Sequence, residues 1–126
     1  MTDDNKPIPT IISTPQGDIE ASKTTVPESR VFRNAWTLEG DAIVVDMDLA
    51  RDIVREKIRA ERAPLLQDLD VEFQRAQEES GDTTSIIEAK KKLREATRDS
   101  RIDAAQDPES LEMAMNTIID EMKDAV

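Results

Sequence analysis

The chain has 126 residues, and its 28 acidic and 17 basic side chains give a formal net charge of −11. This surplus of negative charge repels phosphate backbones and anionic lipids, so it argues against nucleic acid and membrane surfaces as partners. Leu, Ile, Val and Phe together supply only 28 residues, close to the level below which charged chains stay unfolded. We therefore expect about one domain with a thin hydrophobic core.

Further absences narrow the class of protein. No apolar run approaches the ~20 residues that a membrane-spanning helix needs, and the N-terminal MTDDNKPIPT does not resemble a signal peptide. These features predict a soluble protein that is made in the cytoplasm. The sequence contains no Cys, which excludes disulfides, thiolate metal sites and thiol nucleophiles.

Residues 1–30 are predicted to form an extended interaction arm. They hold four of the six prolines, and their isolated apolar residues lack helical spacing. Thr14-Pro15-Gln16-Gly17 suits a type I turn between two short extended pieces, PTIIS and DIEAS. Such a segment buries too little apolar surface to hold itself, so we expect a neighbouring copy or another protein to bind it. The predicted contact residues in the arm are Ile8, Ile11, Ile12 and Ile19.

Residues 31–47 are predicted to form a β-hairpin, and they contain the single Trp and one of the two Phe. Strand-like VFRNAWTL and AIVVDM flank a turn at Glu39-Gly40-Asp41. Alternation places Phe32, Trp36 and Leu38 on one face, which must be covered because an isolated two-stranded hairpin is marginal. Phe32 and Trp36 are therefore either anchors of a protein interface or the centre of the small core.

Residues 48–106 are predicted to form an antiparallel helical hairpin. Asp48 suits the N-cap of the first helix, and the apolar residues that follow have helical spacing. Pro64 should either kink this helix or begin a second one, because a proline inside a helix costs ~3 kcal/mol. The apolar stripe consists of Leu49, Ile53, Val54 and Ile58 before the proline and of Leu66, Leu69, Phe73 and Ala76 after it.

A turn at Ser80-Gly81-Asp82 leads to a return helix over about residues 84–97. Because the connection is short, this helix should pack antiparallel to the first. Its basic side can meet an acidic face of the first helix, although exposed ion pairs set register more than stability. The apolar side holds Ile86, Ala89, Leu93 and Ala96, the basic side holds Lys90, Lys91, Lys92 and Arg94, and the acidic face holds Asp68, Glu72 and Glu79.

Residues 107–126 are predicted to form a C-terminal amphipathic helix. Asp107-Pro108-Glu109 combines a capping residue, a proline at the first helical position and an acidic residue at the positive end of the helix. The apolar residues then follow a heptad spacing over two heptads. This seam either closes the core of the monomer or docks on a copy of the chain or another protein. The predicted contact residues are Leu111, Met115, Ile118 and Met122.

Catalytic and metal chemistry find little support in the sequence. There is no His and no Tyr, so the usual general base and the imidazole metal ligands are missing. Asp46-x-Asp48 begins like a calcium loop, but Arg51 stands where that loop needs Gly and Lys57 where it needs Glu. We therefore predict no catalytic residue, no metal site and no cofactor, and we do not expect an enzyme.

The order of these elements resembles small tail-associated proteins of tailed bacteriophages. A short Trp-containing hairpin leads into a helix with the pattern R-x-x-R-x-x-x-L-x-x-L-D, and a polar turn leads to a return helix with Lys-x-x-Leu-Arg. The resemblance covers roughly residues 31–105, and its helical part is also similar to phage tail assembly chaperones. The chaperone pattern has Trp after Leu-Asp, whereas Val71 follows here, and the Leu111 to Val126 helix replaces its C-terminal tail. The matching segments are RNAWTLEGDAIVVDMDLARDIVREKIRAERAPLLQDLDVEFQRAQEESGD and AKKKLREATRD.

The resemblance implies a virion structural protein of the distal tail, as a fibre, baseplate or fibre-attachment component. Such a protein would act by assembly with other phage tail proteins and with copies of itself, which could form a trimer. Two alternatives stay open at this point. One is a tail-fibre assembly chaperone that is absent from the mature virion, and the other is an adaptor or regulator unrelated to phages.

Overall fold

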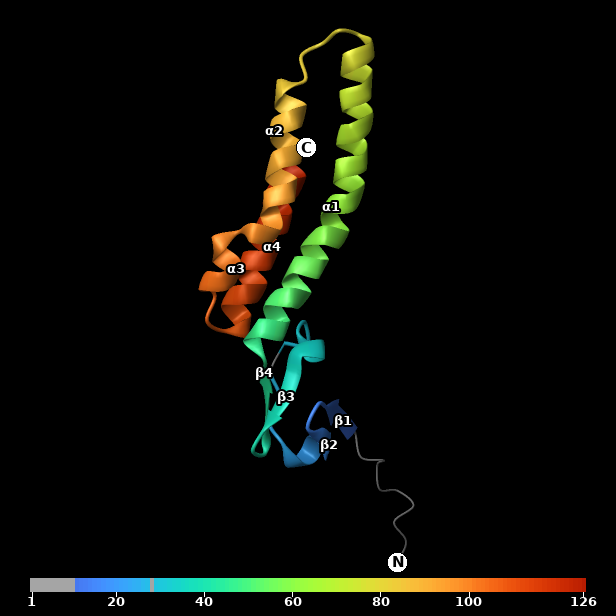
Figure 1. The fold of residues 1–126 in the computed structure, drawn as a ribbon. Coiled ribbons are helices and arrows are strands. Elements are labelled where there is room, and N and C mark those ends of the chain that lie inside the picture. The colour runs from blue at the N-terminus through green and yellow to red at the C-terminus, as the bar shows by residue number, and fades with distance from the viewer. Residues whose placement is uncertain (1–10, 28) are drawn as a thin grey trace, which may run out of the picture. The chain divides into compact units, whose positions relative to one another are not determined.

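The computed structural model describes residues 11–27 and 29–126 and confirms a mainly α fold (Figure 1). The chain divides into two compact units, residues 1–50 and residues 51–126. The first unit contains two short β-hairpins, and the second is helical.

The first hairpin of the N-terminal unit pairs β1 (Ile11–Thr14) with β2 (Gly17–Glu20), and Ile12 lies opposite Ile19. Its turn lies at the predicted position. The Thr14 hydroxyl donates to the carbonyl of Gly17 over 2.6 Å and accepts from the Gln16 amide over 3.2 Å. The described part of the predicted arm is therefore folded back on itself, while Ile8 lies outside the described residues.

The second hairpin pairs β3 (Trp36–Glu39) with β4 (Ala42–Val45) in antiparallel register. The prediction of a strand from residue 31 is wrong, because a 3₁₀ turn at Arg33–Ala35 precedes the strand. The Ala35 amide donates to the Phe32 carbonyl over 2.8 Å, which closes that turn. Phe32 therefore does not alternate with Trp36 on one strand face.

One side chain joins the two hairpins. The Gln16 side-chain oxygen accepts from the Thr37 hydroxyl over 2.7 Å and from the Leu38 amide over 3.0 Å. The carbonyl of Thr25 accepts from the Ile43 amide over 2.9 Å and extends the second hairpin by a single bridge. Short strands that are marginal alone thus support each other within this unit.

The long helix α1 (Met47–Glu78) begins one residue earlier than predicted. Its cap is Asp46 and not Asp48, because the Asp46 carboxylate accepts from the amides of Asp48 and Leu49 over 3.0 and 3.2 Å. A side-chain oxygen here satisfies amides that have no partner within the helix. The adjacent Asp48 then adds a negative charge in the first turn.

Helix α1 continues through Pro64, so of the two expected alternatives, a kink or the start of a second helix, the structure excludes the second. Proline lacks the amide that would bond the carbonyl of Ala60. Both Pro64 and Ala60 are exposed, and water can therefore hydrate that carbonyl. The buried side chains on the opposite face, Ile58 and Leu69, keep the helix packed on both sides of the proline.

The chain reverses after α1 and returns as α2 (Thr84–Glu95), which ends in a 3₁₀ turn at Ala96–Arg98. The two helices run antiparallel, as predicted (Figure 1). A short helix that the sequence did not predict, α3 (Ser100–Ala104), precedes α4 (Pro108–Asp124). The predicted cap of α4 is confirmed, since the Asp107 carboxylate accepts from the Ser110 amide over 2.7 Å.

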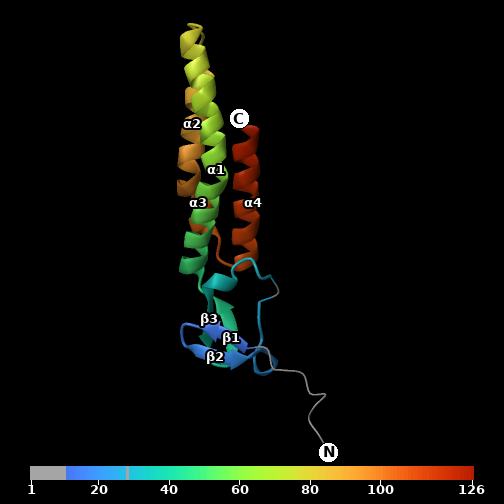
Figure 2. The same cartoon turned by 90° about the vertical axis from the view of Figure 1, so that its right-hand side faces the viewer.

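Helix α4 covers only part of the helical hairpin and ends well short of its tip (Figures 1 and 2). We call residues 51–62 and 93–105 the packed half, because most of the buried side chains lie there or on α4. We call residues 64–92 the open half. The buried side chains of the helical unit are Val54, Ile58, Leu69, Ala89, Leu93, Ala96, Ile102, Ala105, Leu111, Met115, Ile118 and Met122.

Candidate functional site

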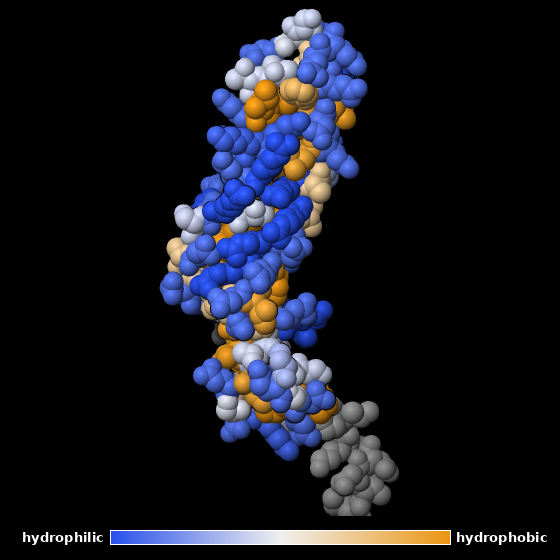
Figure 3. All heavy atoms as spheres, in the orientation of Figure 1, coloured by the Kyte–Doolittle hydropathy of each residue, from blue (hydrophilic) through white to orange (hydrophobic). Residues whose placement is uncertain are grey.

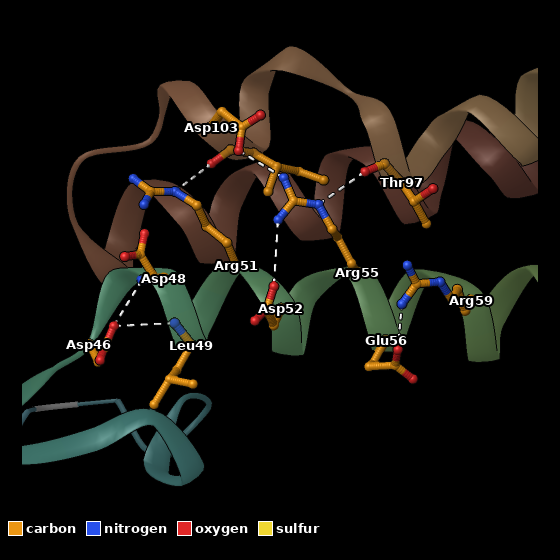
Figure 4. A network of polar contacts seen from close by, with 11 residues as sticks. Asp46, Asp48, Leu49, Arg51, Asp52, Arg55, Glu56, Arg59, Thr97 and Asp103 are labelled. Carbon is orange, nitrogen blue, oxygen red and sulfur yellow. Dashed lines mark hydrogen bonds and ion pairs between the residues drawn. The ribbon is translucent and has the colours of Figure 1, made fainter.

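A row of arginines on α1 is the most extensive polar feature of the helical unit. Arg51, Arg55, Arg59 and Arg62 follow one another at intervals of four, four and three residues, so they share one side of the helix. The first two point toward the segment that contains α3 (Figure 4). The row therefore lies where α1 meets the chain that follows α2.

Arg51 and Arg55 bind the segment between α2 and α4. The Arg51 guanidinium donates to the carbonyls of Ile102 and Ala105 over 3.2 and 2.8 Å. Arg55 donates to the Thr97 carbonyl over 3.2 Å and to the Asp103 carboxylate over 2.7 Å. A planar guanidinium can serve two acceptors at once, which suits this bridging role.

Arg62 repeats this arrangement at the end of α2, where it donates to the carbonyls of Leu93 and Arg94 over 3.3 and 3.1 Å. Carbonyls in the last turn of a helix carry the negative end of its dipole, and the Leu93 carbonyl also accepts from the Ala96 amide. Arg59 differs from its neighbours, because it pairs with Glu56 of its own helix (Figure 4). Three of the four arginines thus fix helix ends by their charge and hydrogen bonds.

Two further contacts join the helices. Lys90 of α2 lies 2.5 Å from the Asp70 carboxylate and 4.9 Å from the centre of the Phe73 ring. Among the described residues, the predicted acidic partners Asp68, Glu72 and Glu79 form no ion pair with the basic side of α2. Arg101 contacts Asp99 at 2.8 Å and Glu121 of α4 at 2.5 Å. Hydrogen bonds from Arg101 hold the pKa of both carboxyls below their ordinary values.

This network has the chemistry of a latch between helices. The latch consists of Arg51, Arg55 and Arg62, which donate hydrogen bonds to five main-chain carbonyls and to the Asp103 carboxylate. Within the described part of the chain, no group of three or more acidic side chains is placed to hold a metal ion. The described helices also include none that is long and apolar enough to cross a membrane.

The predicted contact residues of the C-terminal helix are buried inside the single chain. Leu111 is fully buried, and Met115, Ile118 and Met122 are at most 4% exposed. Within the single chain the seam therefore closes the core of the helical unit, which is the first of the two alternatives that the heptad spacing left open. The heptad spacing identified which face is apolar but could not show that α1 and α2 would cover it.

The predicted contact residues of the N-terminal unit differ in exposure. Phe32 is 1% exposed and belongs to the core, whereas Ile11 is 52% exposed. Ile12, Ile19 and Trp36 are half-buried. The indole nitrogen of Trp36 is buried, and no described residue accepts a hydrogen bond from it.

The exposed apolar residues of the helical unit were not predicted as contacts. Met113 of α4 is 71% exposed, Ile87 of α2 is 51% exposed and Val71 of α1 is 48% exposed. Each lies outside the apolar stripe of its helix, so the periodicity that marked the buried face gave no sign of them. The sign of such a residue in the sequence is that it is apolar but stands among charged residues on the outer face of its helix.

Comparisons with known proteins assign no relative, because no family model, no curated protein and no solved structure matches the chain.

Proposed function

We propose that the chain is a structural protein of the distal tail of a bacteriophage virion, a fibre, baseplate or fibre-attachment component that acts by binding other tail proteins. The proposal starts from the resemblance over residues 31–105. The role is one of binding and not of catalysis. The polar network of the helical unit supports it, because its hydrogen bonds and ion pairs join helices to one another.

The observation that carries an assembly role is the open half of the helical hairpin. Leu69 is the one large side chain of the described open half that is fully buried. Its other apolar side chains remain accessible: Leu66, Phe73 and Ile86 are half-buried, and Val71 and Ile87 are about half exposed. A projection of this kind offers apolar surface to a second protein.

The packed half supports an assembly role as well, because it holds α1 and α2 in place. A partner that binds the open half is connected to the packed half through α1 and α2. The arginines fix these helices to each other and to the chain beyond them. The surface that a partner would meet on the open half includes hydrophobic residues that lie among hydrophilic ones (Figure 3).

Mass spectrometry of purified particles tests this function. A structural component appears in finished virions at a fixed copy number relative to other tail proteins. A tail-fibre assembly chaperone would be found in assembly intermediates and missing from finished particles. Absence from both kinds of sample would overturn the proposal of a phage tail role.

A second experiment tests the open half directly. Val71→Glu and Ile87→Glu place charges on its exposed apolar residues, while Ser110→Glu places one in the exposed first turn of α4. We expect the first two variants to lose incorporation into particles although the isolated chain stays folded. Equal incorporation of all variants would show that the open half is not the docking surface.

A further inference from the structure

Two exposed helix faces of the helical unit carry opposite charge. Residues 84–98, which form α2 and its 3₁₀ extension, have five basic and two acidic side chains. Helix α4 has five acidic side chains and one basic one. The chain as a whole is strongly acidic, so a basic helix face is an exception within it.

The basic face is a row that runs along α2 and ends at Arg98, the last residue of its 3₁₀ extension. It contains Ile87, Lys91, Arg94 and Arg98, which are spaced by four, three and four residues and are all exposed. No ion pair involves the three cations within residues 11–27 and 29–126. These side chains point away from the buried Ala89, Leu93 and Ala96.

Helix α4 has a row of the same spacing on its outer side. It contains Met113, Thr117, Asp120 and Asp124, which are exposed and lie opposite the buried seam. Lys57 shares a groove with Asp120, and Lys92 shares one with Asp124. Neither aspartate forms an ion pair in the described part of the chain.

The two rows match each other position by position. When an α2 is laid parallel to an α4, Ile87 meets Met113 and Lys91 meets Thr117. Arg94 then meets Asp120, and Arg98 meets Asp124. Each exposed apolar side chain is covered by another apolar side chain, and each arginine faces a carboxylate.

We propose that α2 of one copy of the chain docks in parallel alongside α4 of a second copy. The inference rests on the proposed function in that an assembly role brings copies of the chain together. Within one copy, residues of α2 and α4 line a common groove, and the exposed rows lie on the sides of the two helices opposite their buried residues, so each row can meet a different neighbour. The contact is heterologous, because it joins two different surfaces.

Net charge does not prevent this contact. Repulsion between two copies of charge −11 acts at long range, and physiological salt screens it beyond a Debye length of about 8 Å. The facing rows bring unlike charges within that distance. Moderate salt should therefore favour association, and salt high enough to weaken the direct ion pairs should reduce it.

Charge reversal tests the pairing by sedimentation. We expect Arg94→Glu with Arg98→Glu to weaken self-association about 10- to 100-fold, and Asp120→Lys with Asp124→Lys to do the same. An equimolar mixture of the two variants should regain association, because unlike charges face each other again. Recovery in the mixture also shows that both variants are folded.

Disulfide trapping tests the direction of the helices. The natural chain has no Cys, so Ile87→Cys and Met113→Cys introduce one thiol each. Mixed under oxidation, these two variants should form a crosslinked dimer. Ile87→Cys mixed with Asp124→Cys is the matched control, because those positions meet only if the helices run antiparallel.

A chain that stays monomeric at several hundred micromolar would overturn the inference, as would association that both charge-reversed variants retain. Preferential crosslinking of the control pair would overturn the parallel pairing. These outcomes are separate from the test of the proposed function. A virion component that meets only other proteins would still appear in purified particles.

Discussion

The packed half and the open half of the helical unit belong to the same two helices but are held in different ways. In the packed half, α1 buries Val54 and Ile58 completely and binds main-chain carbonyls through Arg55 and Arg62. In the described open half, α1 and α2 are joined by the ion pair of Asp70 with Lys90. Two helices alone therefore make a thin interface, and a third element, α4, completes the core.

This contrast predicts graded stability along the hairpin. Regions with few buried apolar contacts open at lower free energy than the core. We therefore expect amide exchange to be fastest near residues 76–86 and slowest near residues 54–58 and 93.

The largest effect should come from truncating a leucine of the packed half. Leu93→Ala removes a fully buried side chain and should lower the free energy of unfolding by about 2–4 kcal/mol. Leu66→Ala, at a half-buried position of the open half, should cost about 1 kcal/mol. Urea unfolding measures both. Equal losses would contradict the division into two halves.

Removing an arginine of the latch should have the next largest effect. Arg62→Met keeps most of the aliphatic volume but leaves the carbonyls of Leu93 and Arg94 without this donor. We expect a loss of about 1–2 kcal/mol in the free energy of unfolding. Arg59→Met is the matched control, because Arg59 pairs with Glu56 of its own helix and should cost less than about 0.5 kcal/mol.

A smaller and opposite effect is expected at the tip of the hairpin. Ser80 has a φ of +56°, a left-handed conformation that favours glycine, and the Gly81 amide donates to the Ala76 carbonyl over 2.7 Å. Ser80→Gly should therefore raise the free energy of unfolding by about 0.5–1 kcal/mol. Thermal unfolding measures this variant. Gly81→Ala, where the added methyl has ordinary space, is the comparison that distinguishes an effect of backbone conformation from an effect of packing.

The smallest effect should be a pH dependence at Arg101. Its hydrogen bonds lower the folded-state pKa of Glu121 and Asp99. A lowered pKa stabilises the fold above the ordinary pKa, and this contribution is lost as pH falls through the folded value. Stability should therefore decline below about pH 4.5. Glu121→Gln should flatten that decline in unfolding measured from pH 7 to pH 3, and an unchanged slope would contradict the assignment.

Local patterns in the sequence were sufficient for much of the fold. The turn at Thr14–Gly17, the antiparallel helices and the cap at Asp107 depend on residues close together in the chain, and the structure has all three. One local choice, the cap of the first helix, was wrong. Asp46 and Asp48 both suit a cap, and only the position where β4 ends decides between them.

Most of the latch could not be predicted, because its acceptors are main-chain carbonyls that every residue possesses. The sequence shows Arg51, Arg55 and Arg62 on one helix side, but their partners lie 31–54 residues away. Whether the seam is buried within the chain likewise depends on tertiary packing. An apolar stripe indicates burial without indicating whether the covering surface comes from the same chain.

The choice of acceptors in the latch bears on how this protein can drift during evolution. A bond between two side chains is lost when either residue changes, whereas a carbonyl persists through nearly every substitution at its position. Thr97, Ile102 and Ala105 can therefore vary without removing the groups that Arg51 and Arg55 bind. Selection on this contact therefore falls on the arginines and on Asp103, whereas Ile102 and Ala105 are constrained separately because they are buried in the core.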